Sequence, residues 1–84
     1  MKKMKVEVFG RMEWLEMTDE NMNEVITDYY LSDTATEPLW SNDWEEWIEP
    51  GEEFYWVDED PVPAYHDAME WVIEEVIDIE TRDY

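Results

Sequence analysis

The stretch 64–80, AYHDAMEWVIEEVIDIE, has the most regular pattern in the chain and decides the expected fold. Apolar residues recur in it at alternating intervals of four and three: Tyr65, Met69, Val72, Val76 and Ile79. This period is typical of an amphipathic helix with one buried face. Carboxylates recur on the opposite face: Asp67, Glu70, Glu74 and Asp78. The stretch therefore predicts one continuous helix that packs on a sheet and presents an acidic row to solvent.

Residues 3–17 predict a β-hairpin, because apolar and polar side chains alternate along them with a period of two. Gly10-Arg11 is the expected two-residue turn, with glycine in the first position as a type II′ turn requires. Pairing Phe9 with Met12 then places Leu15 and Met17 on the same face as Met4, Val6 and Val8. The hairpin is the expected start of the sheet.

Residues 18–31 predict a second amphipathic helix. Thr18 is a good N-cap residue, and the helix should end near Leu31. The expected apolar face consists of Met22, Val25, Ile26 and Tyr29.

The middle of the chain alternates between polar and aromatic segments. A polar loop is expected over 32–39, a short helix over 42–48 and a strand over 54–57. The acidic turn 58–60 and the extended segment 61–63 follow. This order of elements predicts an α+β fold in a single domain, with a small antiparallel sheet formed by the N-terminal hairpin and a third strand. Two amphipathic helices and one short helix should pack on that sheet.

Acidic residues dominate the composition of the 84-residue chain. Asp and Glu number 25, Lys and Arg number 5, and the formal net charge at pH 7 is -20. So few cations cannot form a basic patch, which excludes direct binding of DNA, RNA or an anionic membrane through such a patch. Charge of this density is typical of disordered chains, but 44% hydrophobic and 15% aromatic residues favour a folded domain with an extreme surface.

Several features bear on the compartment. Cysteine is absent, so the chain has no disulfide framework and no thiolate metal site, as is usual in a reducing cytoplasm. The basic start 1–5 is not followed by the apolar run of a signal peptide. No stretch of about 20 apolar residues could cross a membrane. We therefore expect a cytoplasmic protein.

Catalytic groups are scarce. His66 is the only histidine, and no second histidine can act as a base for Ser32 or Ser41. Carboxylate pairs are so numerous that none of them indicates acid–base catalysis. The acidic run 58–60 lacks the spacing and the glycine of a calcium loop. The sequence therefore predicts no enzymatic activity, no cofactor and no dedicated metal site, and it places His66 on a helix surface.

Three tryptophans allow two interpretations. Trp40, Trp44 and Trp47 fall on one face of the expected short helix. They could close over the sheet as core, together with Phe54 and Trp56. Alternatively, exposed members of the set could anchor a protein partner, because Trp and Tyr are frequent in binding hot spots. Trp44 and Trp47 are the candidates for this second role.

The excess of carboxylates is far larger than solubility requires, since a small domain commonly carries a net charge of about 2–8. Duplex DNA presents one negative charge per about 1.7 Å of its axis. Carboxylates on helix faces, with neighbours about 5–6 Å apart, can present a comparable array to a groove lined by Lys and Arg. The candidate partner-binding carboxylates are Asp67, Glu70, Glu74, Asp78, Glu45, Glu46, Glu49, Asp58, Glu59 and Asp60.

In its small size, high acidity, lack of cysteine and many aromatic residues, the whole chain resembles the DNA-mimic inhibitors of bacteriophages and mobile elements. That class includes antirestriction proteins, anti-CRISPR proteins and uracil-DNA glycosylase inhibitors. The resemblance lies in composition and charge pattern. It implies a target: a restriction, CRISPR or other nucleic-acid-binding protein of the host bacterium, whose basic groove the inhibitor occupies.

A second hypothesis is an acidic binding module, such as an antitoxin or an adaptor, for a partner that is basic for other reasons. The pattern does not separate DNA mimicry from RNA mimicry. A monomer and a homodimer both remain open, because a dimer would extend the charged surface and bury spare Trp side chains. Competition distinguishes the two hypotheses, since DNA or RNA should displace only a mimic from its target.

Overall fold

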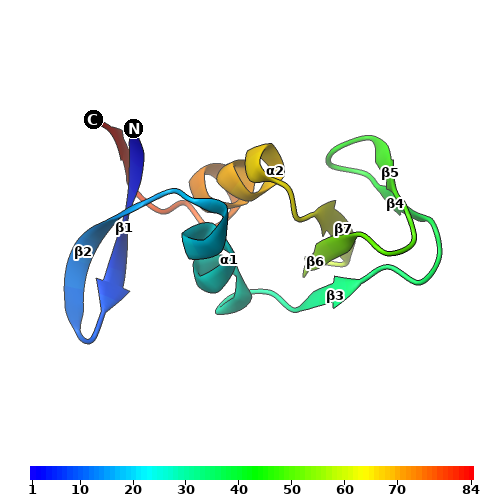
Figure 1. Cartoon of the computed structure of the whole chain (residues 1–84), viewed down its shortest axis with the longest axis horizontal. Helices are drawn as coiled ribbons and strands as arrows, with labels where there is room; N and C mark the ends of the chain where they lie inside the picture. Colours follow the sequence, from blue (N-terminus) through cyan, green and yellow to red (C-terminus); the bar gives the residue numbers. More distant parts are fainter.

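A computed structural model describes residues 1–84 as an elongated molecule with extents of 39 × 23 × 19 Å (Figure 1). The strands are β1 (Lys2–Val8), β2 (Arg11–Glu16), β3 (Ser32–Thr34), β4 (Leu39–Ser41), β5 (Glu46–Ile48), β6 (Glu53–Val57), β7 (Asp60–Pro63) and β8 (Thr81–Asp83). The helices are α1 (Asp19–Thr27), α2 (His66–Trp71) and the π-helical turn η1 (Val72–Val76). Helices α1 and α2 lie in the middle of the molecule, with the β1-β2 hairpin at one end and the β4-β5 hairpin at the other (Figure 1).

The strands form three separate antiparallel sheets, with the orders β2-β1-β8, β3-β6-β7 and β4-β5. The expected fold, one small sheet packed by two amphipathic helices and a short helix, is therefore wrong. Strands outnumber helices, and the third expected strand, β6, pairs with β3 and β7 instead of the N-terminal hairpin.

The N-terminal hairpin forms as expected, but its turn lies at Phe9-Gly10, so that Val8 pairs with Arg11. The φ angles of Phe9 (49°) and Gly10 (80°) are both positive, as in a type I′ turn, whose twist matches that of the flanking strands. The expected pairing of Phe9 with Met12 is therefore wrong by two residues. A shift of two leaves every side chain on the expected face.

Strand β8 is absent from the sequence-based expectation. It pairs with the first half of β1, for example Lys3 with Arg82, and the two chain ends are hydrogen-bonded to each other. The Met1 amino group donates to the Tyr84 carbonyl oxygen at 2.8 Å, and the Tyr84 N–H donates to the Met1 carbonyl at 2.7 Å. Thr81–Asp83 is polar throughout, so no apolar alternation marked it as a strand.

Helix α1 starts as expected. The Thr18 hydroxyl oxygen accepts a hydrogen bond from the Asn21 N–H at 3.1 Å, which confirms Thr18 as the N-cap. Met22 and Ile26 are fully buried. The helix ends at Thr27, earlier than expected, and turns carry the chain to β3.

The helix expected over 64–80 is too long, because the chain is helical only from His66 to Val76. After α2 the chain widens into the π-helical turn, in which the Ile77 N–H donates to the Val72 carbonyl at 2.8 Å. Asp78 then adopts a positive φ of 64°, which ends the helix. The residues beyond it lie beside β1, whose Lys5 N–H donates to the Glu80 carbonyl at 2.9 Å. Pairing with β1 therefore takes the last residues out of the helix.

Strand β6 and the acidic turn after it form as expected. Val57 pairs with Asp60, and Asp58 and Glu59 make the tight turn between β6 and β7. Prolines in β7 are tolerated because β7 is an edge strand. The polar loop expected over 32–39 is corrected, since it contains β3 and the start of β4.

The short helix expected over 42–48 is also wrong, because β4 and β5 form a hairpin there, with 42–45 as its turn. Spacing at i, i+4 and i+7 had favoured a helix. In the hairpin, Trp40 instead pairs directly with Trp47.

Two apolar clusters hold the elements together. The larger lies where the helices meet β1, β6 and β7, and its fully buried members include Met4, Met22, Ile26, Tyr55, Val62, Ala68, Val72 and Ile73. The smaller cluster consists of Ala35, Ile48 and Phe54, with Leu39 packed against it, and fixes the β4-β5 hairpin on the β3-β6-β7 sheet.

Candidate partner-binding surface

All five Lys and Arg residues lie in one sheet. They belong to β1, β2 and β8: Lys2, Lys3, Lys5, Arg11 and Arg82. Every acidic residue except Glu7 and Asp83 lies in the segment 12–81, which contains no Lys or Arg at all. The fold therefore collects the cations at one end of the long axis and leaves the helices and the other two sheets almost purely anionic (Figure 1).

Few carboxylates are neutralised by ion pairs. Those that are paired are Asp19, Glu70, Glu74, Glu80 and Asp83. The remainder of the 25 acidic side chains have no cationic partner. Most of the negative charge is therefore free to attract an external cationic surface.

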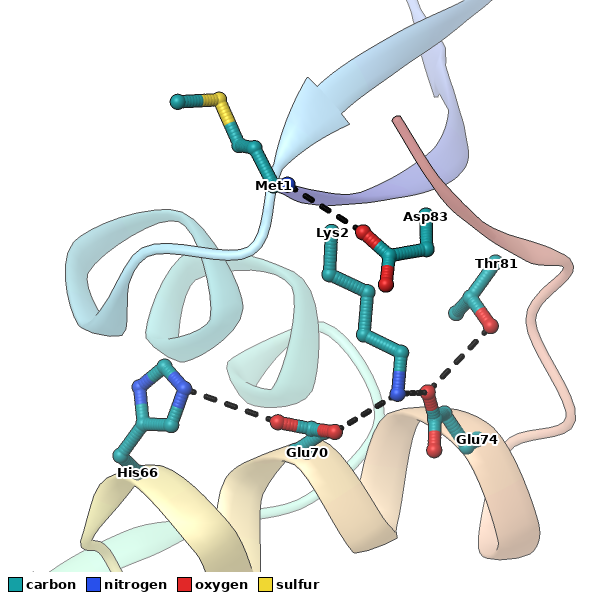
Figure 2. A network of polar contacts seen from close by, with 7 residues as sticks. All are labelled: Met1, Lys2, His66, Glu70, Glu74, Thr81 and Asp83. Atoms are coloured by element: carbon teal, nitrogen blue, oxygen red, sulfur yellow. Dashed lines mark hydrogen bonds and ion pairs between the residues drawn. The ribbon is translucent and has the colours of Figure 1, made fainter.

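Two residues of the predicted helix row are engaged inside the molecule. Lys2 Nζ lies 2.8 Å from Glu70 Oε1 and 2.5 Å from Glu74 Oε1 (Figure 2). Both carboxylates raise the pKa of the Lys2 ammonium. Glu74 also accepts a hydrogen bond from the Thr81 hydroxyl at 3.3 Å. Glu70 and Glu74 thus tie the helix to the N-terminal sheet and offer less charge to a partner than the sequence suggested.

The rest of the row is split. Asp67 is exposed and shares a shallow hollow of about 220 Å³ with Glu70, Glu74 and Glu75. Asp78 lies outside this hollow, because the π-helical turn and the positive φ at Asp78 break the spacing that would have aligned it. Glu75 replaces Asp78 beside the other three.

His66 stands at the start of α2 and joins it to α1. Its Nδ1 lies 2.5 Å from Asp19 Oδ1, and its Nε2 lies 3.6 Å from Glu70 Oε2. The hydrogen bond to Asp19 raises the pKa of His66 above its ordinary value, with the Glu70 and Asp67 charges adding to the effect. His66 is exposed, as expected, and it links two helices.

Asp60 is a structural residue. Its Oδ1 accepts hydrogen bonds from the Asn42 N–H at 2.9 Å and the Asn42 side chain at 3.2 Å, and its Oδ2 accepts from the Asp43 N–H at 3.1 Å. Partial burial would raise the pKa of Asp60, but the two N–H donors lower it below its usual value. Burial and the nearby Asp60 carboxylate raise the pKa of Asp43. Asp60 therefore holds the β4-β5 turn and is not a free partner contact.

Glu45, Glu46 and Glu49 all lie in or beside the β4-β5 hairpin. Glu45 and Glu49 are exposed, whereas Glu46 is half-buried near Tyr65. Burial and a hydrogen bond to Glu46 raise the pKa of Tyr65 to about 12. Glu45 and Glu49 are thus the free charges of this group.

The tryptophans divide between core and surface. Trp44 packs edge-on against Tyr65 and Trp71, at 5.7 and 5.9 Å between ring centroids, and its indole nitrogen is buried without a hydrogen-bond partner. Trp47 is exposed together with Trp40, which sequence reasoning had not chosen as a contact. Trp47 and Trp40 are therefore the exposed aromatic candidates of this hairpin, whereas Trp44 is packed inside the molecule.

Four predicted contact carboxylates occupy left-handed backbone conformations: Glu45 (φ 51°), Asp58 (φ 49°), Glu59 (φ 75°) and Asp78 (φ 64°). Such conformations cost about 1–2 kcal/mol for residues with a Cβ, and glycine or asparagine usually fills them. All four are exposed and lack an ion pair. Carboxylates thus stand at turns where other residues would be more stable.

Phe9 is a further feature that sequence reasoning missed. It sits at the tip of the β1-β2 hairpin, fully exposed, with a positive φ. The alternating pattern places Phe9 on the polar face with Lys5 and Glu7, which is a signal of exposure, but the turn was expected one residue later.

No helix of the structure is long and apolar enough to cross a membrane. No group of three or more His, Asp and Glu side chains converges as a metal site would require. Comparison with known proteins finds no family model, no curated protein and no solved structure that matches this chain.

Proposed function

We propose that this protein is a nucleic-acid mimic that inhibits a basic nucleic-acid-binding protein by occupying its groove. The observation that carries the proposal is the cation-free segment 12–81, which holds all but two of the acidic residues and forms most of the molecule's length. A groove built from Lys and Arg for a polyanion would attract such a surface from a distance.

Charge and size support the proposal quantitatively. A duplex as long as the 39 Å axis of the protein carries about 23 phosphate charges, at one per about 1.7 Å. The formal net charge of the protein is -20. Its two shorter extents, 23 and 19 Å, are close to the width of a duplex. A single molecule therefore matches roughly one helical turn of DNA in charge and dimensions.

The contact surface of the proposed mimic is centred on the end of the molecule that carries β3 to β7. Its free carboxylates include Glu45, Glu49, Asp58 and Glu59, with Asp67 on the adjoining helix. The Trp40 and Trp47 rings lie on the same hairpin as Glu45. Asp60 holds the β4-β5 turn of this surface, whereas Glu70 and Glu74 are paired with Lys2 of the N-terminal sheet, so none of the three is a main contact.

The target class is a defence protein of a host bacterium, with restriction and CRISPR nucleases first, and the site of action is the cytoplasm where such proteins work. Inhibition needs no reaction, no cofactor and no metal. Occupancy alone blocks the nucleic-acid channel.

An acidic binding module, such as an antitoxin or adaptor, is the second candidate. The exposed Trp40–Trp47 pair favours it, because aromatic anchors give affinity that does not depend on charge. A partner of this kind would be recognised at the hairpin and would not exchange with DNA or RNA.

The test immobilises the purified protein and passes nuclease-treated bacterial lysate over it at about 0.1 M salt, where the Debye length is about 10 Å. Mass spectrometry identifies what is retained, and duplex DNA or RNA is then added. Mimicry predicts that one nucleic-acid-binding protein is enriched and is displaced by nucleic acid. Retention that nucleic acid does not disturb would contradict mimicry and favour the binding module.

Two matched variants sharpen this test. In the first, Glu45, Glu49 and Glu59 become Gln. In the second, the same number of charges is removed from the N-terminal sheet by Gln at Glu7, Glu13 and Glu16. All six side chains are exposed and none makes an ion pair. Mimicry centred on the β3–β7 end predicts weaker retention of the first variant only.

A further inference from the structure

A groove of about 830 Å³ separates the N-terminal sheet from α1 and the end of the π-helical turn. Its floor is formed by β1 and β2, through Val6, Val8 and Leu15. One wall is α1 with the turn after it, and the opposite wall is the segment 77–80, which runs beside β1. It therefore lies near the end of the molecule away from the β4-β5 hairpin (Figure 1).

The lining of the groove combines apolar and charged side chains, and it is partly open to solvent. Eight of its 14 lining residues are hydrophobic. Met12 and Tyr29 are 57% and 59% exposed at its edges, although both could bury their side chains against an occupant. An apolar side chain that becomes buried against an occupant stabilises the complex, because its surface is removed from water. The groove thus has solvent-exposed apolar surface that an occupant would bury.

The rim of the groove is acidic. Its carboxylates come from both walls and from β1: Glu7, Glu24, Asp28, Asp78 and Glu80. Lys5 is the one cation of the lining, and it already lies 3.8 Å from Glu80. The other four carboxylates make no ion pair. Apolar floor and anionic rim together specify an occupant that is apolar on one side and cationic on the other.

We propose that this groove binds an amphipathic peptide segment of a partner protein, with Lys or Arg along its polar side. The negative charge of the rim disfavours three other kinds of occupant: a second copy of this chain, anionic lipid and nucleic acid. A second copy of this chain would bring two acidic rims together, and anionic lipid or nucleic acid would be repelled. A cationic amphipathic segment satisfies both the apolar floor and the rim.

This site is separate from the proposed mimic surface and stands without it. The groove is built from β1, β2, α1 and 77–80, whereas the mimic surface is centred on β3 to β7. Loss of groove binding would leave competition with nucleic acid intact, and the reverse also holds.

The experiment uses two peptides of about 18 residues, which is five helical turns. Both contain the same Leu and Lys residues, arranged as an amphipathic helix in one and scrambled in the other. Binding to the full chain is followed by ¹⁵N chemical-shift perturbation at about 0.1 M and 1 M salt, where the Debye lengths are about 10 and 3 Å. The proposal predicts that the amphipathic peptide binds at both salt concentrations and shifts the amides of Val25, Tyr29 and Ile79, whereas the scrambled peptide is released at 1 M.

Exposed positions supply the variants, so that folding is preserved. Tyr29→Ser and Met12→Ser remove apolar surface from the groove without changing its charge, and they should weaken binding of the amphipathic peptide by about tenfold or more. Leu31→Ser is the control, because Leu31 is 78% exposed and does not line the groove. The affinity of this control variant for the amphipathic peptide should stay within about twofold of the wild-type affinity.

Two results would overturn the proposal. One is equal release of both peptides at 1 M salt, with shifts spread over the acidic surface, since that would show attraction by charge alone. The other is a dimer in sedimentation that Tyr29→Ser dissociates, because the occupant would then be a second copy of this chain.

Discussion

The indole rings of Trp40 and Trp47 face each other across the β4-β5 hairpin, with centroids 5.3 Å apart and planes inclined at 65°. They remain 42% and 57% exposed. Edge-to-face pairs of this kind contribute about 0.5–1.5 kcal/mol beyond their buried area. The pair is thus a rigid apolar platform on the end of the molecule that has no Lys or Arg.

Replacing either ring should separate binding from folding. Trp47→Ala is expected to weaken the partner complex by about 2 kcal/mol or more, a factor of about 30, while folding loses about 1 kcal/mol. The salt dependence of binding should not change, because no charge is removed. Calorimetric titration at several salt concentrations measures the affinity and its salt dependence, and urea unfolding measures the loss in folding stability. Leu31→Ala, an exposed apolar control, should bind normally, and equal losses in the two variants would rule out an aromatic contact.

Asp60 and Asp43 should respond to pH in opposite directions. The lowered pKa of Asp60 means that its contribution to folding is complete above its ordinary pKa of 3.8 and is lost as the pH falls through the folded value. Asp60→Asn should therefore destabilise the protein by about 1–3 kcal/mol at pH 7, and the difference should shrink in acid. Urea unfolding of wild type and variant across pH measures it.

The raised pKa of Asp43 has the opposite sign, since its charged form is disfavoured in the folded state. Asp43→Asn should therefore stabilise the protein at pH 7, and the gain should disappear as Asp43 becomes protonated in acid. If both Asn variants shifted stability in the same direction at pH 7, the hydrogen-bond pattern around the β4-β5 turn would be wrong.

His66 offers a direct titration, because it is the only histidine. Its pKa is raised by Asp19, so this ion pair stabilises the fold fully below the ordinary pKa of 6.5, and the stabilisation is lost as the pH rises through the folded value. NMR titration of the ring protons should give a pKa above 6.5, and Asp19→Asn should lower it. A smaller decrease is expected for Glu70→Gln, whose oxygen is more distant. An unchanged pKa in Asp19→Asn would refute the link between the two helices.

Glu59 tests whether turn carboxylates are kept at the expense of stability. Its φ of 75° suits glycine, so Glu59→Gly should raise the free energy of unfolding by about 1 kcal/mol. Glu59→Gln removes the charge but keeps the strained backbone, and it should show little of this gain. Both variants should bind the partner more weakly than wild type. A stable variant with unchanged partner affinity would show that this carboxylate is not a contact.

Local signals predicted several elements correctly. The alternation of apolar and polar residues predicted which side chains of the N-terminal hairpin share a face. Thr18 predicted the start of α1, and the aromatic run 54–57 predicted β6. Each of these depends on residues close together in the sequence. Pairing between distant segments, such as Thr81–Asp83 with β1, could not be predicted from such local signals.

The β4-β5 hairpin shows the same limit in the candidate site. The spacing of Trp40, Trp44 and Trp47 predicts a helix there, although Asn42 is a common turn residue. The turn is stabilised by the carboxylate of Asp60, which lies far along the chain and could not be paired with it from the sequence. The net charge, by contrast, depends on composition alone and needs no fold to be known. Even so, only the structure shows that Glu70 and Glu74 form ion pairs with Lys2.

The most direct test of mimicry is a competition titration with the captured partner. Labelled duplex DNA or RNA is bound to that partner, and increasing amounts of this protein are added at about 0.1 M salt. Mimicry predicts complete release of the duplex, an apparent dissociation constant that rises in proportion to the competing nucleic acid, and steep weakening of the protein complex with salt. A ternary complex that contains partner, duplex and this protein together would contradict it.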